Sequence, residues 1–174
     1  IFSLWSASEK EAIGIYEIIS DNSNKKDEAY YINTNQSFAF AGGVATASFG
    51  TATAKAIEDR NEVDEDGEPL LDDNGDQVVT KGLKTQKKEI IKQQASGLLT
   101  PTDWYIIKAV DVESYSAPAN IVTYRANIRT ASNDMETIID NASDVDALAT
   151  LYNYTEQPDG THTRPLGEFP TLEV

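Results

Sequence analysis

The chain has 174 residues, and its 29 acidic and 14 basic side chains give it a net charge of −15 at pH 7. This balance argues against a nucleic-acid binder, whose phosphate contacts need clustered Lys and Arg, and against a protein drawn to anionic lipid. Cysteine is absent, which excludes a disulfide framework, a thiolate zinc site and a cysteine nucleophile.

A small β-rich lobe with one short helix is predicted over residues 1–57. Ser6 or Ser8 can cap the helix, with a glutamate three residues later, and Gly14 suits its end. A two-residue turn at Gly42-Gly43 predicts a hairpin. The segments with strand-like composition are 15–19, 30–34, 37–40 and 44–54.

Most of the excess acid lies in residues 58–80, which we predict to form an acidic β-ribbon or loop. Residues 58–76 contain ten carboxylates and one base, which gives this segment a net charge of −9. Two similar stretches follow each other there, one around Asp66-Gly67 and one around Asn74-Gly75. Such pairs are typical of type I′ hairpin turns.

A helical lobe is predicted over residues 81–155. In residues 83–99, apolar side chains recur at the spacing of one helical face, and Lys and Gln side chains cover the other face. The next helix is expected over about residues 104–111, with Thr100 as its cap and Pro101 in its first position.

Two further helices complete the predicted helical lobe. Ser116 or Ala117 is expected to cap the first of them, with Pro118 early in the helix, which then continues toward Asp140. The segment 143–146 is expected to open a last short helix, because its carboxylates would lie at the positive end of the helix dipole.

The C-terminal residues 156–174 are predicted to form an extended tail, which holds three of the six prolines. The whole chain therefore predicts an α+β fold. Its small β-rich lobe (1–57) carries the acidic β-ribbon or loop (58–80), and the helical lobe (81–155) follows.

No motif in the chain supports catalysis. A Ser-His-Asp arrangement would have to use His162, the only histidine, which lies in a segment predicted to be loop. The chain has neither a Walker loop nor a Gly-x-Gly-x-x-Gly pattern. Most carboxylates belong to the charged run of residues 58–76, which is typical of a solvated surface rather than of a glycosidase pair. We therefore expect a protein that is not an enzyme and needs no cofactor.

A calcium site in the acidic segment is an alternative hypothesis. Glu62, Asp64, Asp66 and Asp73 fall at positions 1, 3, 5 and 12 of an EF-hand register, where oxygen ligands are required. The register is poor, because position 12 lacks the usual bidentate glutamate and no helix is predicted on either side. An acidic ribbon kept soluble by its charge is the simpler interpretation.

Four aromatic and basic residues of the helical lobe have two interpretations. Trp104, Tyr124, Arg125 and Arg129 could form a partner-binding face or an anion site. The structural interpretation is favoured, in which Trp104 and Tyr124 belong to the core and the two arginines pair with nearby acids.

No segment of the chain predicts membrane insertion or a targeting signal. The longest apolar stretches are far shorter than the ~20 residues of a membrane span. The chain begins with Ile1 rather than Met, without a basic region or a long apolar run. We expect a piece of a longer polypeptide, with a processed N-terminus as the alternative.

The helical lobe resembles a module of tailed bacteriophages found in tail-fibre assembly proteins and in tail-fibre-associated virion proteins. In that module a helix leads to LL-x-x-TDW, then to a proline and then to YR-x-x-IR. The matching segments here are 95–108 (ASGLLTPTDWYIIK), 117–118 (AP) and 123–129 (TYRANIR), so that Trp104, Tyr124, Arg125 and Arg129 stand at the motif positions. The flanks resemble the family loosely.

The resemblance implies a noncatalytic virion protein of the tail or tail-fibre region that acts by protein-protein interaction. It would be made in the host cytoplasm, and other virion proteins would be its partners, with symmetric copies of the chain as one arrangement. A transient tail-fibre assembly chaperone and a Ca²⁺-dependent module that binds the host surface are the alternatives. The acidic segment 58–76 departs from the family pattern.

Overall fold

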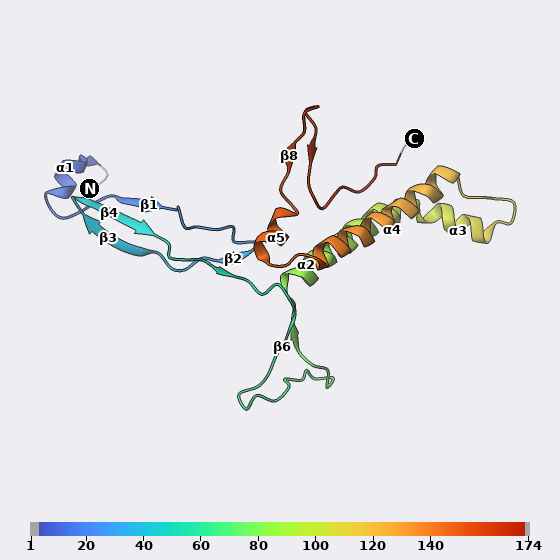
Figure 1. The fold of residues 1–174 in the computed structure, drawn as a ribbon, viewed down its shortest axis with the longest axis horizontal. Coiled ribbons are helices and arrows are strands. Elements are labelled where there is room, and N and C mark those ends of the chain that lie inside the picture. Colours follow the sequence, from blue (N-terminus) through green and yellow to red (C-terminus); the bar gives the residue numbers. More distant parts are fainter. Residues whose placement is uncertain (1–3, 173–174) are drawn as a thin grey trace. The chain divides into compact units, whose positions relative to one another are not determined.

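The computed structural model describes residues 4–172, and the chain divides into two compact units, residues 1–55 and 56–174. We call them unit 1 and unit 2. Small sheets lie in unit 1 and the long helices lie in unit 2 (Figure 1), which confirms the predicted α+β fold. No helix in the described part of the chain has the length and apolar character needed to cross a membrane.

Unit 1 begins with the short helix α1 (Ala7–Glu11), which the capping pattern predicts. The Ser6 hydroxyl accepts a hydrogen bond from the Glu9 backbone N–H, and the Glu9 carboxylate accepts one from the Ser6 N–H at 2.8 Å. Gly14, with a φ of +80°, lies just after the helix. Ser6 is therefore the cap, and Ser8 lies inside the helix.

The main sheet of unit 1 has three strands in the order β1-β4-β3. Its strands are β1 (Ile18–Asp21), β3 (Ser37–Ala41) and β4 (Val44–Ser48). β1 runs parallel to β4, whereas β3 and β4 form an antiparallel hairpin. The predicted hairpin is confirmed, and Gly42 and Gly43 have φ values of +58° and +82°, as a type I′ turn requires.

The strand predicted over residues 44–54 is divided into two pieces. β4 ends at Ser48, and Thr53–Ala54 forms β5, which pairs with β2 (Tyr31–Ile32) in a separate two-stranded sheet. Between them, the Gly50 N–H donates to the Thr34 side chain at 2.9 Å instead of to a strand. A side-chain acceptor therefore interrupts the ladder where composition alone predicts continuity.

The acidic segment of unit 2 is a β-ribbon, but its turns are not type I′. β6 (Arg60–Asn61) pairs with β7 (Val79–Thr80), and two single bridges continue the ribbon. A type I′ turn needs a positive φ at both central residues. Gly67 has a φ of +84°, but in the described chain no residue other than glycine has a positive φ, so Asp66 does not meet this requirement. The Asp64 N–H donates to the Glu68 carbonyl at 2.9 Å, and the Asp64 carboxylate accepts from the backbone N–H groups of Asp66 and Glu68. This is a type I turn followed by a glycine bulge.

The same turn occurs twice more in unit 2. Asp72 makes the equivalent bonds to Asn74 and Asp76, and the Gln157 N–H donates to the Thr161 carbonyl at 2.7 Å. The third turn joins β8 (Thr155–Glu156) to β9 (His162–Thr163). The segment predicted as an extended tail therefore contains a hairpin.

The predicted helices of unit 2 are all present, although some caps differ. They are α2 (Leu83–Leu99), the 3-10 turn η2 (Thr100–Thr102), α3 (Asp103–Asp111), α4 (Ala119–Asp140) and α5 (Val145–Thr150).

The caps of these helices agree only in part with the sequence predictions. The short helix predicted to open in segment 143–146 is α5, and the Asp144 carboxylate caps it by accepting from the Ala147 N–H at 2.8 Å. Thr100 does not cap the start of the next helix as predicted: it is the C-cap residue of α2, and its hydroxyl donates back to the Ser96 carbonyl at 2.8 Å. Pro118 is itself the residue before α4, so the expected cap at Ser116 or Ala117 is wrong.

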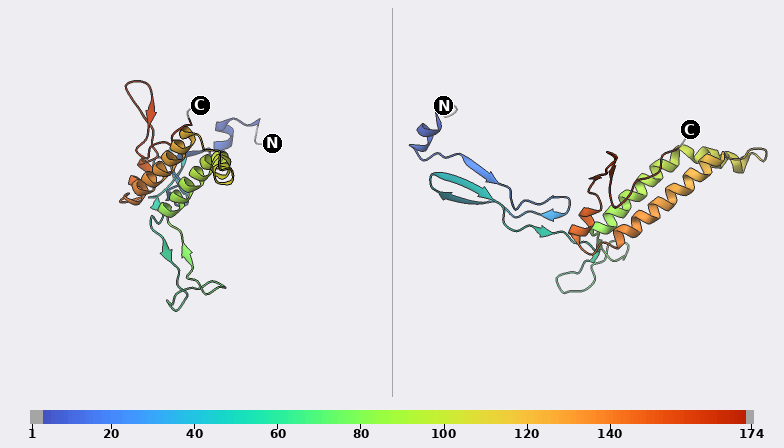
Figure 2. Two further views of the ribbon diagram at one scale, coloured as in Figure 1. Left: turned by 90° about the vertical axis from the view of Figure 1, so that its right-hand side faces the viewer. Right: turned by 45° about the horizontal axis from the view of Figure 1, so that its top comes forward.

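α2 and α4 lie side by side (Figures 1 and 2), and the core of unit 2 lies along them. The fully buried large side chains are Ile91 of α2, Ile128 and Ile139 of α4, Leu148 of α5 and Leu166 of the C-terminal segment. Further along that segment, Phe169 and Leu172 pack against the cluster that contains Ile128. The C-terminal segment is therefore part of the helical core.

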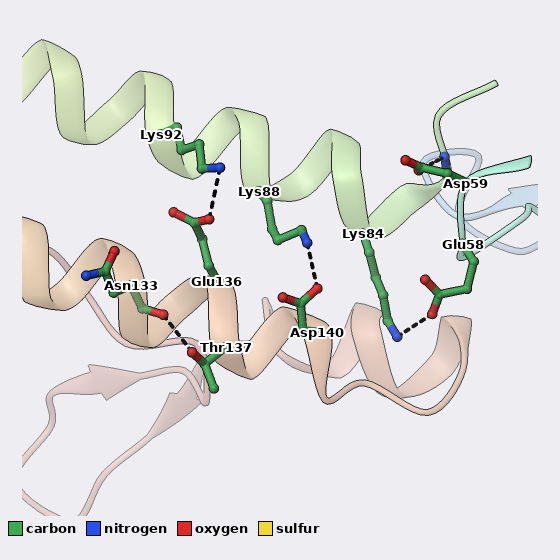
Figure 3. A network of polar contacts seen from close by, with 10 residues as sticks. Glu58, Asp59, Lys84, Lys88, Lys92, Asn133, Glu136, Thr137 and Asp140 are labelled. Atoms are coloured by element: carbon green, nitrogen blue, oxygen red, sulfur yellow. Dashed lines mark hydrogen bonds and ion pairs between the residues drawn. The ribbon is translucent and has the colours of Figure 1, made fainter. Parts of the chain in front are cut away.

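A ladder of ion pairs fixes the register of α2 against its neighbours (Figure 3). The Lys88 ammonium lies 2.7 Å from Asp140, and Lys92 lies 3.2 Å from Glu136, one turn further along both helices. Lys84 continues the row to Glu58, at 2.5 Å. The Asp140 carboxylate raises the pKa of Lys88. Each exposed pair contributes about 0–1 kcal/mol, so the ladder selects a register more than it stabilises the fold.

Asp59 caps α2 from a distant position in the chain. The residue before α2 is Gly82, which has no side chain to cap the helix, and the Asp59 carboxylate accepts from the Gly82 N–H at 2.8 Å. This bond, followed by one to the Thr85 hydroxyl, lowers the pKa of Asp59 below its usual 3.8. The negative charge also faces the positive end of the helix dipole.

We predict that acid weakens this contact. A carboxyl group whose pKa is lower in the folded chain stabilises the fold at neutral pH, and this contribution is lost as the pH falls below about 4 through the folded pKa. Asp59→Asn should therefore lose less thermal stability than the wild type between pH 6 and pH 3. Thermal melting followed by circular dichroism checks this, and equal losses in the two proteins would contradict it.

Candidate functional site

Four residues of the matched segments, Leu99, Thr102, Asp103 and Arg125, meet where the turn η2 between α2 and α3 lies against α4. Arg125 of α4 is buried, and its Nη1 group lies 2.8 Å from the Leu99 carbonyl and 2.6 Å from the Thr102 hydroxyl. It also forms an ion pair with Asp103 at 2.7 Å. The Leu, Thr and Asp of the motif are therefore joined by its Arg, and we call these four residues the Arg125 corner.

Local sequence explains why the chain turns at this corner. Pro101 lies in the first turn of η2, a position where its missing N–H removes no helical hydrogen bond. The Thr102 hydroxyl donates to the Leu99 carbonyl at 2.7 Å. With these bonds in place, α3 begins at Asp103 in a fixed position relative to α4.

Tyr124 and Trp104 have different environments. Tyr124 is buried in a cluster with Ala95 and Ile128, as predicted. Trp104 is 50% exposed, so the prediction that it belongs to the core is wrong. The physical reason is that α3 has no buried residue, because α2 and α4 pack against each other and α3 extends beyond the corner.

Three apolar residues of α3 form one exposed surface. Trp104, Ile107 and Val110 are spaced three residues apart, which places successive members on the same side of a helix. Ile107 is 60% exposed and Val110 is 81% exposed. The Trp104 ring also contacts the ring of Tyr105, with centroids 4.0 Å apart. We call Trp104, Ile107 and Val110 the α3 face.

The sequence alone indicates Trp104 but not the other two members of the α3 face. The signal for them was present, because a nine-residue helix with three large apolar side chains at this spacing needs a surface to cover them. Of these three residues, the sequence singles out Trp104 alone and predicts that it belongs to the core. Only the packing of α2 on α4 shows that this core is already complete.

Arg129 lies one turn beyond Arg125 at the edge of an open groove of about 430 Å³. It is exposed and donates to the Arg125 carbonyl at 3.2 Å. Arg125 pairs with an acid as expected, but within residues 4–172 Arg129 forms no ion pair. The groove also contains Asp103, which pairs with Arg125, and Lys92, which pairs with Glu136.

The four residues proposed to bind calcium are not gathered into one site. Within the part of the chain that the structure describes, no group of three or more histidine, aspartate or glutamate side chains is arranged to hold a metal ion. Glu62 is paired with Arg60 at 2.8 Å. The Asp64 carboxylate is engaged by the backbone of its own turn, whereas Asp66 and Asp73 lie in successive turns. The geometry therefore gives the calcium hypothesis no support.

His162 lies in the short hairpin near the C-terminus. It is exposed and lies opposite Glu156 across the β8–β9 pair. The position is a strand end on a two-residue ladder rather than the loop that the sequence predicts.

Comparisons of the chain with protein-family models, with curated proteins and with solved structures found no match.

Proposed function

We propose that the chain is a noncatalytic bacteriophage virion protein of the tail or tail-fibre region, and that it acts by binding other virion proteins through the α3 face. The observation that carries this proposal is the exposure of Trp104 together with Ile107 and Val110. The resemblance to the phage module supports a role in the virion, and the exposed apolar side chains of α3 support a role in binding other proteins.

The motif residues have two separable roles in this proposal. The Arg125 corner is a buried structural joint that positions α3. Trp104 takes no part in that joint, although it follows Asp103 directly. A large aromatic side chain held at the surface by a rigid joint is suited to anchor a protein-protein interface, because little conformational entropy is lost when it is buried.

The surface chemistry of the α3 face indicates the kind of partner. Its three members are apolar, and the neighbouring cation, Lys108, lies 5.7 Å from the Trp104 ring centroid and 4.4 Å from that of Tyr115. A protein surface with an apolar depression and an acidic or polar rim would match this arrangement. A contact of this type can be made in the host cytoplasm during assembly and retained in the particle.

Mass spectrometry of purified phage particles tests the proposal. We expect the chain to be present in a constant ratio to the other tail proteins. If it is abundant in infected cells but absent from particles, the structural role is contradicted and the assembly-chaperone alternative is supported. Presence in particles at that constant ratio excludes a purely transient chaperone.

A further inference from the structure

The open edge of the unit 1 sheet is the strand β3. This strand has the sequence Ser-Phe-Ala-Phe-Ala, and within residues 4–172 it is bonded on one side only, to β4. It has no charged residue and no proline, the devices that usually prevent edge strands from pairing. Phe38 is 68% exposed and Phe40 is 58% exposed. The strand is therefore suited to pair with another strand.

The hairpin turn determines which backbone groups of β3 are free. In a two-residue hairpin the residues that flank the turn, here Ala41 and Val44, exchange hydrogen bonds, and the pattern then alternates along the strands. Ala39 therefore directs its N–H and C=O toward β4. Phe38 and Phe40 direct theirs toward the open edge.

We infer that β3 pairs with β3 of a second copy of this chain, in an antiparallel register centred on Ala39. The sequence Phe-Ala-Phe is the same in both directions around this residue. In this register Phe38 of each copy lies opposite Phe40 of the other, and the free backbone groups of the two residues bond to each other. The product is a six-stranded sheet with a two-fold axis at Ala39.

The palindrome and the small net charge of unit 1 favour a second copy over a different partner, and the charge at the other edge favours β3 over β1. The palindrome matches β3 to itself in both side chains and backbone groups, and the paired phenylalanines form cross-strand aromatic contacts. Unit 1 has six acids and four bases, a net charge of −2, so two copies repel each other weakly through this unit. The opposite edge strand, β1, ends in the charged Asp21 and is less suited to pairing.

Disulfide cross-linking of single-cysteine variants tests the register, because the natural chain has no cysteine. In the proposed dimer, the two Ala39 residues lie opposite each other as a non-hydrogen-bonded pair, and their Cα atoms are about 4.5 Å apart. Disulfides need about 4.4–6.8 Å. The control is Ala41→Cys, on the same strand and the same sheet face. In the proposed register Ala41 lies opposite Ser37 of the other copy, so the two thiols are about 13 Å apart.

We expect the full-length Ala39→Cys chain to form a cross-linked dimer under mild oxidation at least tenfold faster than the Ala41→Cys chain. Equal rates for the two variants would contradict the inference, and so would the absence of cross-linking in both. Analytical ultracentrifugation of the cysteine-free chain provides a second measurement. A two-chain mass that falls to one chain in Phe38→Lys supports the inference, and a one-chain mass for the natural sequence overturns it.

This inference is independent of the proposed function. If the chain is monomeric but enters phage particles, the dimer inference is contradicted and the proposed function stands. If the chain is dimeric but absent from particles, the proposed function is contradicted and the dimer inference stands.

Discussion

Replacing Arg125 with methionine should lower the free energy of unfolding by about 2–3 kcal/mol, the range expected when hydrogen bonds to a buried charged group are lost. The methionine preserves most of the side-chain volume, so the change isolates the contacts to Leu99, Thr102 and Asp103. Urea unfolding followed by circular dichroism measures the effect.

Arg129→Met is the matched control for this prediction. Arg129 is on the same helix but is exposed, and its described contact is one hydrogen bond to a backbone carbonyl. We expect a change within about 0.5 kcal/mol, as for most surface substitutions. If the two variants were equally stable, the Arg125 corner would not be the joint that holds α3.

Replacing Gly82 with alanine should have an effect of similar size for a different reason. A Cβ atom at this position would lie 2.3 Å from the carbonyl carbon and oxygen of Glu58 and 2.6 Å from the carbonyl oxygen of Ile57. These are backbone atoms, so the ribbon and α2 would have to separate, and the bond from Gly82 to Asp59 would weaken. We expect a loss of about 3 kcal/mol or local detachment of the ribbon.

Gly97 of the same helix provides a control of opposite sign. A Cβ atom there meets nothing within 4 Å, and Gly97 lies inside α2. Gly97→Ala should therefore stabilise the chain by about 1 kcal/mol, the helix-propensity difference between the two residues. Destabilisation by both substitutions in thermal melts would show that α2 tolerates no added side chain, and the explanation from the close approach at Gly82 would be wrong.

The helices were predictable because their signals are local. The apolar spacing over residues 83–99 and the carboxylates of segment 143–146 act within a few positions, and the helices predicted from them are present. The cap of α2 was not predictable, because Asp59 lies 23 residues before Gly82. The turn type at Gly67 was missed because the Asp64 side chain selects it by bonding to the backbone.

The sequence could predict which residues form the candidate site, but not which of them are buried and which are exposed. Trp104 and Arg125 lie in two separate matched segments, and the sequence predicts that the tryptophan belongs to the core. Whether an apolar side chain becomes buried depends on whether another element is free to cover it. Here α2, α4, α5 and the C-terminal segment complete the core, which leaves the α3 face exposed.

The central claim is that the α3 face binds another virion protein. Its most direct test compares the natural chain with a Trp104→Ser, Ile107→Ser variant, by quantifying each in purified particles with mass spectrometry. Val122→Ser with Ile90→Ser is the control, because both residues are about half exposed but lie on α4 and α2. Melting temperatures of all three proteins establish that they are folded.

We predict that the α3 variant enters particles at least about tenfold less than the natural chain, as expected when a central aromatic anchor is removed. The control variant should enter normally. Normal incorporation of the folded α3 variant would contradict the claim that this face is the binding surface.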